Sequence, residues 1–225
     1  DDVLVGAWRS ATGATRTAAA YLLYGPVTAG GDLARADARL LGPGAGADTG
    51  YAVSGAGDVN RDGLADILVG GWRNDTGGTG AGAAFLLYGP VSGDRSLDLA
   101  DASFVGEEEG DAAGYAVSGA GDVDGDGFAD VLVGAPDQIG NADPGVVYLL
   151  RGPLTGDLDL GLADARFDGE QRDDLAGSAV AGAGDVDGDG FDDVLVGASH
   201  HDGGGPSAGA AYLLYGPLDA DRRLS

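Results

Sequence analysis

The sequence contains no cysteine, no methionine and no lysine. Without cysteine the chain forms no disulfide bonds, so this residue type gives no information about the redox state of its compartment. No run of roughly 18 apolar residues is present, which excludes a membrane-spanning helix. No signal peptide begins the sequence, and we therefore expect it to be a mature or excised segment.

Positive charge is scarce. The 12 basic residues are all arginines, and against 37 acidic residues they leave a formal net charge of −25. No basic patch can meet phosphates, so we expect no nucleic-acid partner and no membrane insertion. Two interpretations of the acidity apply together: some carboxylates bind cations, and the rest form a salt-adapted or highly soluble surface.

The sequence repeats itself at intervals of about 64 residues. The recurring segments are DVLVG-like runs at 2–6, 66–70, 130–134 and 193–197, and YLLYGP-like runs at 21–26, 85–90, 148–153 and 212–217. We divide the chain into a partial unit 1–49, units 50–113 and 114–176, and a partial unit 177–225. All four belong to one predicted region over 1–225.

Each complete unit holds four short apolar stretches, and the two partial units hold three each. Their Val, Leu, Tyr and Phe content and the Gly-, Pro- and Asp-rich turns between them predict strands. Glycine recurs too often for helices. Runs that are apolar throughout, such as 85–88, indicate strands covered on both faces, as in propeller blades. Small residues such as Gly55 and Ala56 suit tight packing near a central axis.

The predicted fold class is therefore all-β, a β-propeller of four-stranded antiparallel blades with about 3.5 repeats in this chain. A solenoid fits less well, because its repeats usually have about 20–30 residues. Both ends of the sequence fall inside a unit. We favour a chain that continues into a larger propeller over a compact four-bladed ring or an assembly of several chains through open blade edges.

An aspartate-rich loop follows the first predicted strand of three units, at 58–66, 122–130 and 185–193. Side-chain oxygens stand at loop positions 1, 3, 5 and 9, and the backbone carbonyl of position 7 can point inward. The candidate metal ligands are Asp58, Asn60, Asp62, Leu64 and Asp66; Asp122, Asp124, Asp126, Phe128 and Asp130; and Asp185, Asp187, Asp189, Phe191 and Asp193. Asp2 matches position 9 of a further loop.

These loops predict about three Ca²⁺ sites, because calcium takes six to eight oxygen ligands, whereas Mg²⁺ prefers a tighter octahedron and Zn²⁺ prefers sulfur or imidazole. Glycine at position 6 permits the sharp turn. A single Asp-Gly loop could be only a hairpin turn, but three copies share the same oxygen positions. An EF-hand is rejected, because position 12 is valine (Val69, Val133, Val196) in place of glutamate.

The units resemble the FG-GAP repeat of integrin α-subunit propellers. The FG part is similar to Gly50-Tyr51, Gly114-Tyr115 and Gly177-Ser178, and the GAP part to Gly134-Ala135-Pro136, Gly6-Ala7-Trp8, Gly70-Gly71-Trp72 and Gly197-Ala198-Ser199. The resemblance implies a propeller, usually of seven blades, with calcium loops on one face. It also implies an extracellular or cell-surface setting and a partner surface on the opposite face. The chain is too short for seven blades.

We expect no enzyme. The run Ser199-His200-His201-Asp202 contains triad residue types, but adjacent residues rarely converge, and a solvated loop is the better interpretation. We interpret the acidic run at 107–109 in the same way. Trp8 and Trp72, each followed by arginine, suit exposed protein or glycan recognition, or packing between blades.

The predicted function is thus a calcium-binding, non-catalytic, secreted interaction or adhesion module with a protein or glycan ligand. The alternatives are a structural unit that self-assembles and an accessory propeller attached to a catalytic domain outside this segment. No ligand follows from the fold alone.

Overall fold

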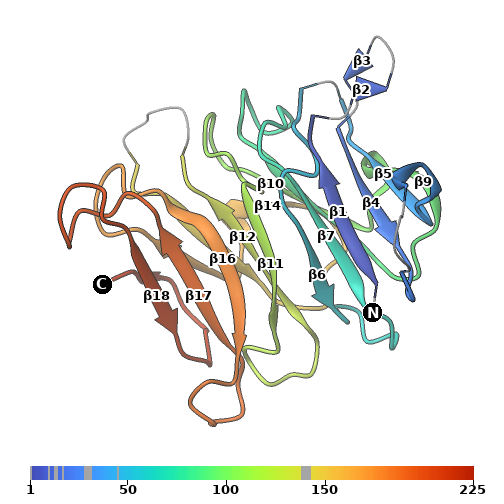
Figure 1. The fold of residues 1–225 in the computed structure, drawn as a ribbon. Helices are drawn as coiled ribbons and strands as arrows, with labels where there is room; N and C mark the ends of the chain where they lie inside the picture. The colour runs from blue at the N-terminus through green and yellow to red at the C-terminus, as the bar shows by residue number, and fades with distance from the viewer. Residues whose placement is uncertain are drawn as a thin grey trace.

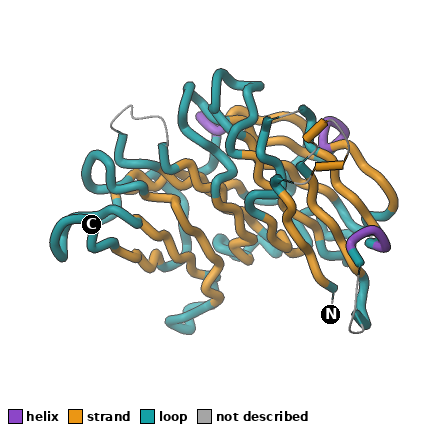
Figure 2. The backbone as a smooth tube through the Cα atoms, turned by 45° about the horizontal axis from the view of Figure 1, so that its top comes forward, coloured by secondary structure: helices purple, strands orange, loops and turns teal. Residues whose placement is uncertain are grey.

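The structure is a computed structural model that describes residues 2–9, 11–12, 15–16, 18–27, 32–44, 46–137 and 143–225. Its regular elements are β-strands and three short 3₁₀ turns, η1 (Leu33–Arg35), η2 (Leu97–Leu99) and η3 (Leu160–Leu162) (Figure 2). The prediction of an all-β fold is confirmed. Within the described residues, no helix has the length and apolar character to cross a membrane.

All of the strands that the repeat predicts are present. The first blade contains β1 (Val3–Ala7), β4 (Ala19–Leu23) and β5 (Ala38–Leu41); the second contains β6 (Val53–Gly57), β7 (Asp66–Gly71), β8 (Ala83–Leu87) and β10 (Ala102–Val105); the third contains β11 (Ala116–Gly121), β12 (Asp130–Ala135), β13 (Val146–Leu150) and β15 (Ala165–Asp168); and the fourth contains β16 (Ala176–Gly184), β17 (Asp193–Ala198) and β18 (Ala210–Leu214). A small hairpin, β2 (Ala11–Thr12) and β3 (Thr15–Arg16), connects β1 to β4.

The chain forms consecutive blades of a β-propeller. Figure 1 shows the blades side by side in chain order, with the two termini at opposite ends of the row. Within each blade the successive strands pair antiparallel, from β6 to β10 in the second blade and from β11 to β15 in the third. Every residue of β8 and β12 is buried, which confirms strands covered on both faces.

A short strand from the following unit extends the outer edge of each of the first three blades. β9 (Gly93–Ser96) pairs parallel with β5, β14 (Gly156–Asp159) with β10, and β19 (Arg222–Arg223) with β15. The sequence analysis did not predict these strands, because they are polar and follow a Gly-Pro turn. They protect an outer edge that would otherwise expose unpaired backbone groups, and they tie neighbouring blades together.

Glycine on the innermost strands lets neighbouring blades approach closely. A Cβ atom on Gly119 of β11 would lie 2.9 Å from the carbonyl oxygen of Gly55 on β6. A Cβ atom on Gly182 of β16 would lie 2.6 Å from the carbonyl oxygen of Gly119. Real Cβ contacts are longer than this, so larger residues would push the blades apart. The tight packing expected of these small residues is confirmed.

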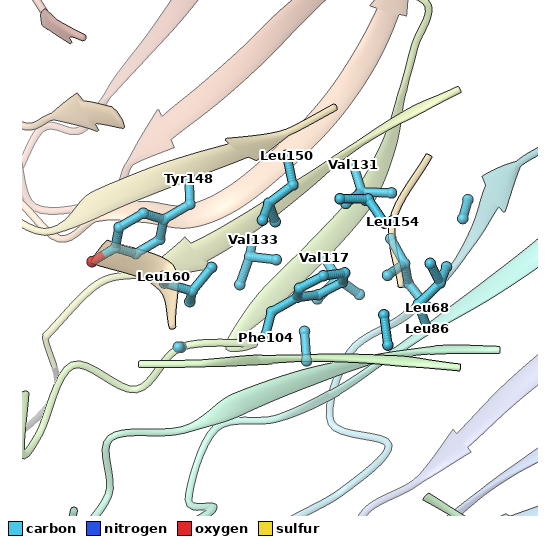
Figure 3. Close-up of a cluster of buried hydrophobic side chains, with 14 of the residues drawn as sticks. Leu68, Leu86, Phe104, Val117, Val131, Val133, Tyr148, Leu150, Leu154 and Leu160 are labelled. Carbon is cyan, nitrogen blue, oxygen red and sulfur yellow. The ribbon is translucent and has the colours of Figure 1, made fainter. Parts of the chain in front are cut away.

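The largest hydrophobic cluster lies between the second and third blades. Figure 3 shows Leu86 and Phe104 of the second blade facing Val133 and Leu150 of the third, with Leu160 of η3 beside them. Phe104 and Leu160 are each only 1% exposed. Burial of a side chain of this size contributes about 1.5–3 kcal/mol to the free energy of folding.

A hydrogen bond to the next blade recurs at the residue that follows β4, β8 and β13. The Tyr24 hydroxyl donates to the carbonyl oxygen of Val91 over 2.8 Å, and the Tyr88 hydroxyl donates to that of Leu154. In the third unit Arg151 replaces the tyrosine, and its guanidinium donates to the carbonyl oxygen of Leu218. The Gly-Pro peptide bond that follows each of these residues is cis.

Candidate metal centre

The three acidic loops lie at the same end of the blades. They connect β6 to β7, β11 to β12 and β16 to β17, and they extend from the lower edge of the molecule in Figure 1. Val69, Val133 and Val196 lie within strands. This rules out the EF-hand, as expected, because an EF-hand loop ends in a helix.

The last aspartate of each loop is buried at the start of the second strand. One oxygen of Asp130 accepts a hydrogen bond from the N–H of Val123 over 2.8 Å, and the other accepts from the N–H of Gly152 over 3.0 Å. Asp66 and Asp193 make the same two bonds in their own units. This carboxylate therefore joins the start of the loop, the second strand and the turn after the third strand.

The turn after the third strand must contain glycine for steric reasons. A Cβ atom on Gly152 would lie 2.6 Å from the Cβ of Phe128, and one on Gly216 would lie 2.5 Å from that of Phe191. The glycine brings its N–H within reach of the buried aspartate, and the side chain at loop position 7 covers it. The repeated Gly-Pro pair and the loop therefore form one structural unit.

The first aspartate organises the turn through backbone N–H groups. In the second loop the two oxygens of Asp122 accept from Gly125 over 2.8 Å and from Gly127 over 2.9 Å. Asp126 accepts from the N–H of Phe128 over 2.9 Å. Gly127 has a φ of 85°, and its counterparts Gly63 and Gly190 also lie in the left-handed region, which explains glycine at position 6.

Carboxylates gather closely in two of the loops. Ligand atoms of Asp122, Asp124 and Asp130 lie within 4.8 Å of one another. The same holds for Asp185, Asp187 and Asp193. Among the residues that the structure describes, these two groups do not include Asp126 and Asp189, the aspartates at loop position 5.

The first loop differs because position 3 is an amide. The Asn60 side chain donates to Asp62 over 3.0 Å, while its oxygen accepts from the N–H of Asp62 over 2.8 Å. Asp58 accepts from the N–H groups of Asp62 and Gly63, as the first aspartate does in the third loop. The backbone scaffold is therefore the same, with one carboxylate fewer.

Burial and crowding favour the protonated forms of Asp130 and Asp66 when no cation is bound. Desolvation raises the pKa of Asp130 to about 6, with added repulsion from Asp124 and Asp122, although two backbone N–H groups oppose the shift. Desolvation also raises the pKa of Asp66 above its usual range. A bound cation would reverse this effect, because it favours ionised carboxylates.

The donor set fits calcium. All side-chain donors are carboxylate or amide oxygens, and each carboxylate oxygen retains a lone pair after it accepts one N–H. Three carboxylates within 4.8 Å repel one another strongly unless a cation or a proton lies between them. Hard oxygen ligands on a flexible turn are the environment that Ca²⁺ prefers.

Asp2 occupies the place of the last loop residue in the first unit. Its side-chain oxygen accepts from the N–H of Gly25 over 2.7 Å, as Asp66 accepts from that of Gly89. This is the position that the repeat predicts for Asp2.

Two segments of the chain match a family model. The model is described as the FG-GAP repeat, and it matches residues 113–150 and 176–214, which include the second and third acidic loops. This chain carries FG-GAP repeats. The resemblance inferred from the Gly-Tyr and Gly-Ala-Pro segments is confirmed, and an acidic loop lies between the two parts in each matched repeat.

Curated relatives agree with this assignment. The chain is 32% identical to Integrin alpha-5 of Xenopus laevis over 153 residues, which covers 66% of this chain and 14% of that protein. It is 32% identical to Integrin alpha-6 of Gallus gallus over 177 residues, which covers 76% of this chain and 15% of that protein. The chain therefore spans about one-seventh of the length of these relatives.

The histidine segment at 199–202 and the acidic run at 107–109 are each less exposed to solvent than the sequence predicts. His201 is buried, and its Nδ1 lies 3.1 Å from Asp174, which does not belong to the Ser199–Asp202 run. Glu107 accepts from the Tyr148 hydroxyl and pairs with Arg166, each over 2.6 Å. The expectation of a solvated segment was wrong for these two residues, because Asp174 from the loop before β16 contacts His201, and Tyr148 and Arg166 from β13 and β15 contact Glu107. His200 and Glu108 are exposed as expected.

An aromatic cluster lies at the opposite ends of the strands from the acidic loops. Tyr51 contacts Trp8 and Tyr115 with ring centroids 5.4 and 4.8 Å apart, and Trp72 lies 5.9 Å from Tyr115. The Tyr51 hydroxyl donates to the Tyr115 hydroxyl over 2.9 Å. These side chains are half-buried, so both interpretations of the tryptophans hold in part: they pack between blades and keep an exposed edge.

Proposed function

We propose that this chain is a calcium-stabilised, non-catalytic interaction module of an extracellular or cell-surface protein. The observation that carries the proposal is the repeated group of three carboxylates within 4.8 Å, held by backbone N–H groups at the ends of paired strands. In this proposal each acidic loop holds one Ca²⁺ through positions 1, 3, 5 and 9 and the carbonyl at position 7. The bound ion neutralises the carboxylates and fixes the turn between two strands.

The adhesion role rests on kinship with integrin α-subunits, since a fold by itself does not determine a function. In this proposal the partner is a protein or a glycan, and it binds the face opposite the calcium loops. The aromatic cluster supports that choice. Arg9 and Arg73 stack on Trp8 and Trp72 at 4.1 and 4.3 Å from the ring centroids, and Trp and Arg are the residue types enriched in binding hot spots.

Calcium binding is tested by melting the protein in EDTA and in millimolar calcium, with calorimetry of the calcium titration. Sites of extracellular modules have dissociation constants of about 10⁻⁴–10⁻³ M, so millimolar calcium should raise the melting temperature by mass action. Magnesium at the same concentration is the control. A melting temperature that is the same in EDTA and in calcium would contradict the proposal.

The interaction face is tested by tryptophan fluorescence, because the chain has 2 tryptophans and both belong to the aromatic cluster. Titration with purified matrix proteins or glycans should shift the emission only when a ligand covers that face. A ligand that binds with unchanged emission, and whose affinity survives Trp72→Phe with Arg73→Gln, would place the interaction elsewhere.

A further inference from the structure

Asp192, the eighth residue of the third acidic loop, is hydrogen-bonded to the second loop. Its Oδ2 accepts from the backbone N–H of Asp122 over 2.8 Å, and its own N–H donates to the carbonyl oxygen of Asp122 over 3.1 Å. Asp122 is the first candidate ligand of its loop. Both polar groups of its backbone are therefore held by one residue of the next blade.

The first and second loops share only half of this connection. The N–H of Ala129, the eighth residue of the second loop, donates to the carbonyl oxygen of Asp58 over 3.1 Å, but alanine has no acceptor for the N–H of Asp58. The packing is otherwise alike. A Cβ atom on Gly57 would lie 2.7 Å from the Cβ of Ala129, and one on Gly121 would lie 2.8 Å from that of Asp192. At loop position 8 the two junctions differ by one carboxylate, and the first junction additionally has Arg61 over the Phe128 ring, 4.9 Å from its centroid.

We infer that Asp192 is a positioning residue that couples calcium binding in loop 122–130 to calcium binding in loop 185–193. The inference rests on the proposed calcium function. Asp192 precedes Asp193, the last candidate ligand of the third loop, so an ion bound there adds to the restraint that the hydrogen bonds of Asp193 already place on the backbone around Asp192. A fixed Asp192 holds Asp122 in place, and the second loop then loses less conformational freedom when its own ion binds.

The coupling is positive and reciprocal. Each of these two loops increases the calcium affinity of the other by the same factor, because linkage of binding free energies is symmetric. Simple electrostatics predicts the opposite sign, since the first bound cation reduces the negative potential that attracts the second. Salt screens that opposing effect, with a Debye length of about 3 Å at 1 M, and leaves hydrogen-bonded coupling in place.

The experiment measures calcium binding by calorimetry in about 0.5 M salt, where surface charges are largely screened. The double variant Asp58→Asn with Asp62→Asn blocks the first loop and leaves the second and third loops as a pair. Adding Asp187→Asn with Asp189→Asn blocks the third loop and leaves the second alone. Asparagine keeps one acceptor oxygen, so the loops lose charge and retain most of their backbone hydrogen bonds; Asp58→Asn gives up one of the two that Asp58 accepts.

Blocking the third loop should lower the calcium affinity of the second loop about five- to tenfold, the effect expected for one hydrogen bond to a charged group at a partly exposed site. In Asp192→Ala the same block should change that affinity less than about twofold. Asp192→Asn, which retains an acceptor oxygen, should preserve most of the coupling. This variant separates the hydrogen bond from the charge.

Ala129→Asp provides the converse test at the other junction. With the third loop blocked, it should strengthen the coupling between the first and second loops, which in the unmodified chain share only the hydrogen bond from the N–H of Ala129 to Asp58. This variant keeps Asp192 intact, so the test remains valid if Asp192→Ala folds poorly.

The outcomes separate this inference from the function on which it rests. Calcium binding whose coupling is the same in the unmodified chain and in Asp192→Ala would overturn the inference alone. The inference alone would also be overturned if Asp192→Ala were less stable in EDTA but left the coupling between the second and third loops unchanged. Asp192 would then have a purely structural role. If the unmodified chain showed no calcium binding by calorimetry, both the proposed calcium function and this inference would be overturned.

Discussion

The carboxylate of Asp130 accepts a hydrogen bond from the backbone N–H of Gly152 over 3.0 Å. Its second oxygen accepts from the N–H of Val123 over 2.8 Å, and the side chain is fully buried. The candidate calcium ligand at position 9 is therefore also a structural residue, which joins three segments of the blade before any ion binds. This double role makes the effect of removing Asp130 differ from that of removing the other loop aspartates.

We expect Asp130→Ala to lower the free energy of unfolding by about 3 kcal/mol even in EDTA, because two buried N–H groups lose their acceptor. Urea unfolding in EDTA measures this change. Asp126→Ala is the matched control, since Asp126 is exposed and, among the described residues, accepts a hydrogen bond only from Phe128. It should cost less than about 1 kcal/mol in EDTA and should mainly reduce the calcium effect. Equal losses for the two variants would argue against the structural role of Asp130.

The stability of the calcium-free protein should fall as the pH rises from about 4 to about 6. The pKa of Asp130 is raised from 3.8 to about 6 by burial, so the folded state binds the proton more tightly than the unfolded state does. That contribution is complete below pH 3.8 and is lost as the pH rises through about 6. Asp111, whose pKa burial also raises to about 6, acts in the same direction.

Calcium should reverse this dependence, because protons and calcium compete for the same Asp130 oxygens. The increase in melting temperature caused by calcium should therefore grow from pH 5 to pH 7. Melting curves with and without calcium across this range measure it. Asp111→Asn is the control, since Asp111 lies away from the acidic loops: it should flatten the EDTA profile and leave the calcium increment unchanged. A calcium increment independent of pH would contradict the prediction.

The repeat predicted most of the fold because each unit shows the same short apolar stretches and the same turn residues. Gly152 could be anticipated as a turn, but its hydrogen bond to Asp130 depends on two segments 22 residues apart meeting at one end of a blade. The polar strand β14 has no hydrophobic pattern, so its parallel pairing with β10 could not be predicted. Asp192 differs from Ala65 and Ala129, the residues at position 8 of the other two loops, and this difference is visible in the sequence. Its hydrogen-bond partner Asp122 lies 70 residues away and could not be predicted from the sequence.

His201 should retain its proton to a higher pH than a free histidine. Its Nδ1 lies 3.1 Å from Asp174, and its Nε2 lies 4.0 Å from Glu170. The hydrogen bond to Asp174 raises the pKa of His201 above its usual 6.5, with further help from Glu170 and Asp202. The resulting stabilisation is present below pH 6.5 and is lost as the pH rises through the folded-state pKa.

Ring-proton NMR titration measures the pKa of His201 directly. His201→Gln should reduce the loss of stability between pH 6 and pH 8, whereas His200→Gln should leave it unchanged. If the His201 ring titrated below its usual range, burial would outweigh the Asp174 contact and the prediction would be wrong.

Asn60→Asp should strengthen calcium binding by the first loop about tenfold at most, since affinity in such loops rises with the number of charged ligands. The substitution replaces an amide that donates to Asp62 over 3.0 Å with a third carboxylate beside Asp58 and Asp62. In EDTA the same variant should be slightly less stable, because it loses that hydrogen bond and adds repulsion. The calcium affinity should therefore rise while the melting temperature in EDTA falls, and an unchanged calcium affinity would count against a calcium site in this loop.

Arg151→Tyr should strengthen calcium binding by the second loop. The Arg151 guanidinium lies 3.5 Å from Asp124, a member of the carboxylate group, and therefore offsets part of the charge that attracts the cation. Tyrosine is the residue that the other units carry here, and in Tyr24 and Tyr88 its hydroxyl makes the bond between blades that Arg151 makes to Leu218.

The fold should tolerate this substitution, because the donor to Leu218 is retained. A partly exposed ion pair contributes up to about 1 kcal/mol, so its removal should raise the calcium affinity of the second loop up to about fivefold. Calorimetry with the first and third loops blocked isolates this site. Arg166→Gln, which removes an arginine from Glu107 away from the loops, is the charge-matched control and should leave the affinity unchanged. An equal increase in both variants would show that net charge, and not the contact with Asp124, sets the affinity.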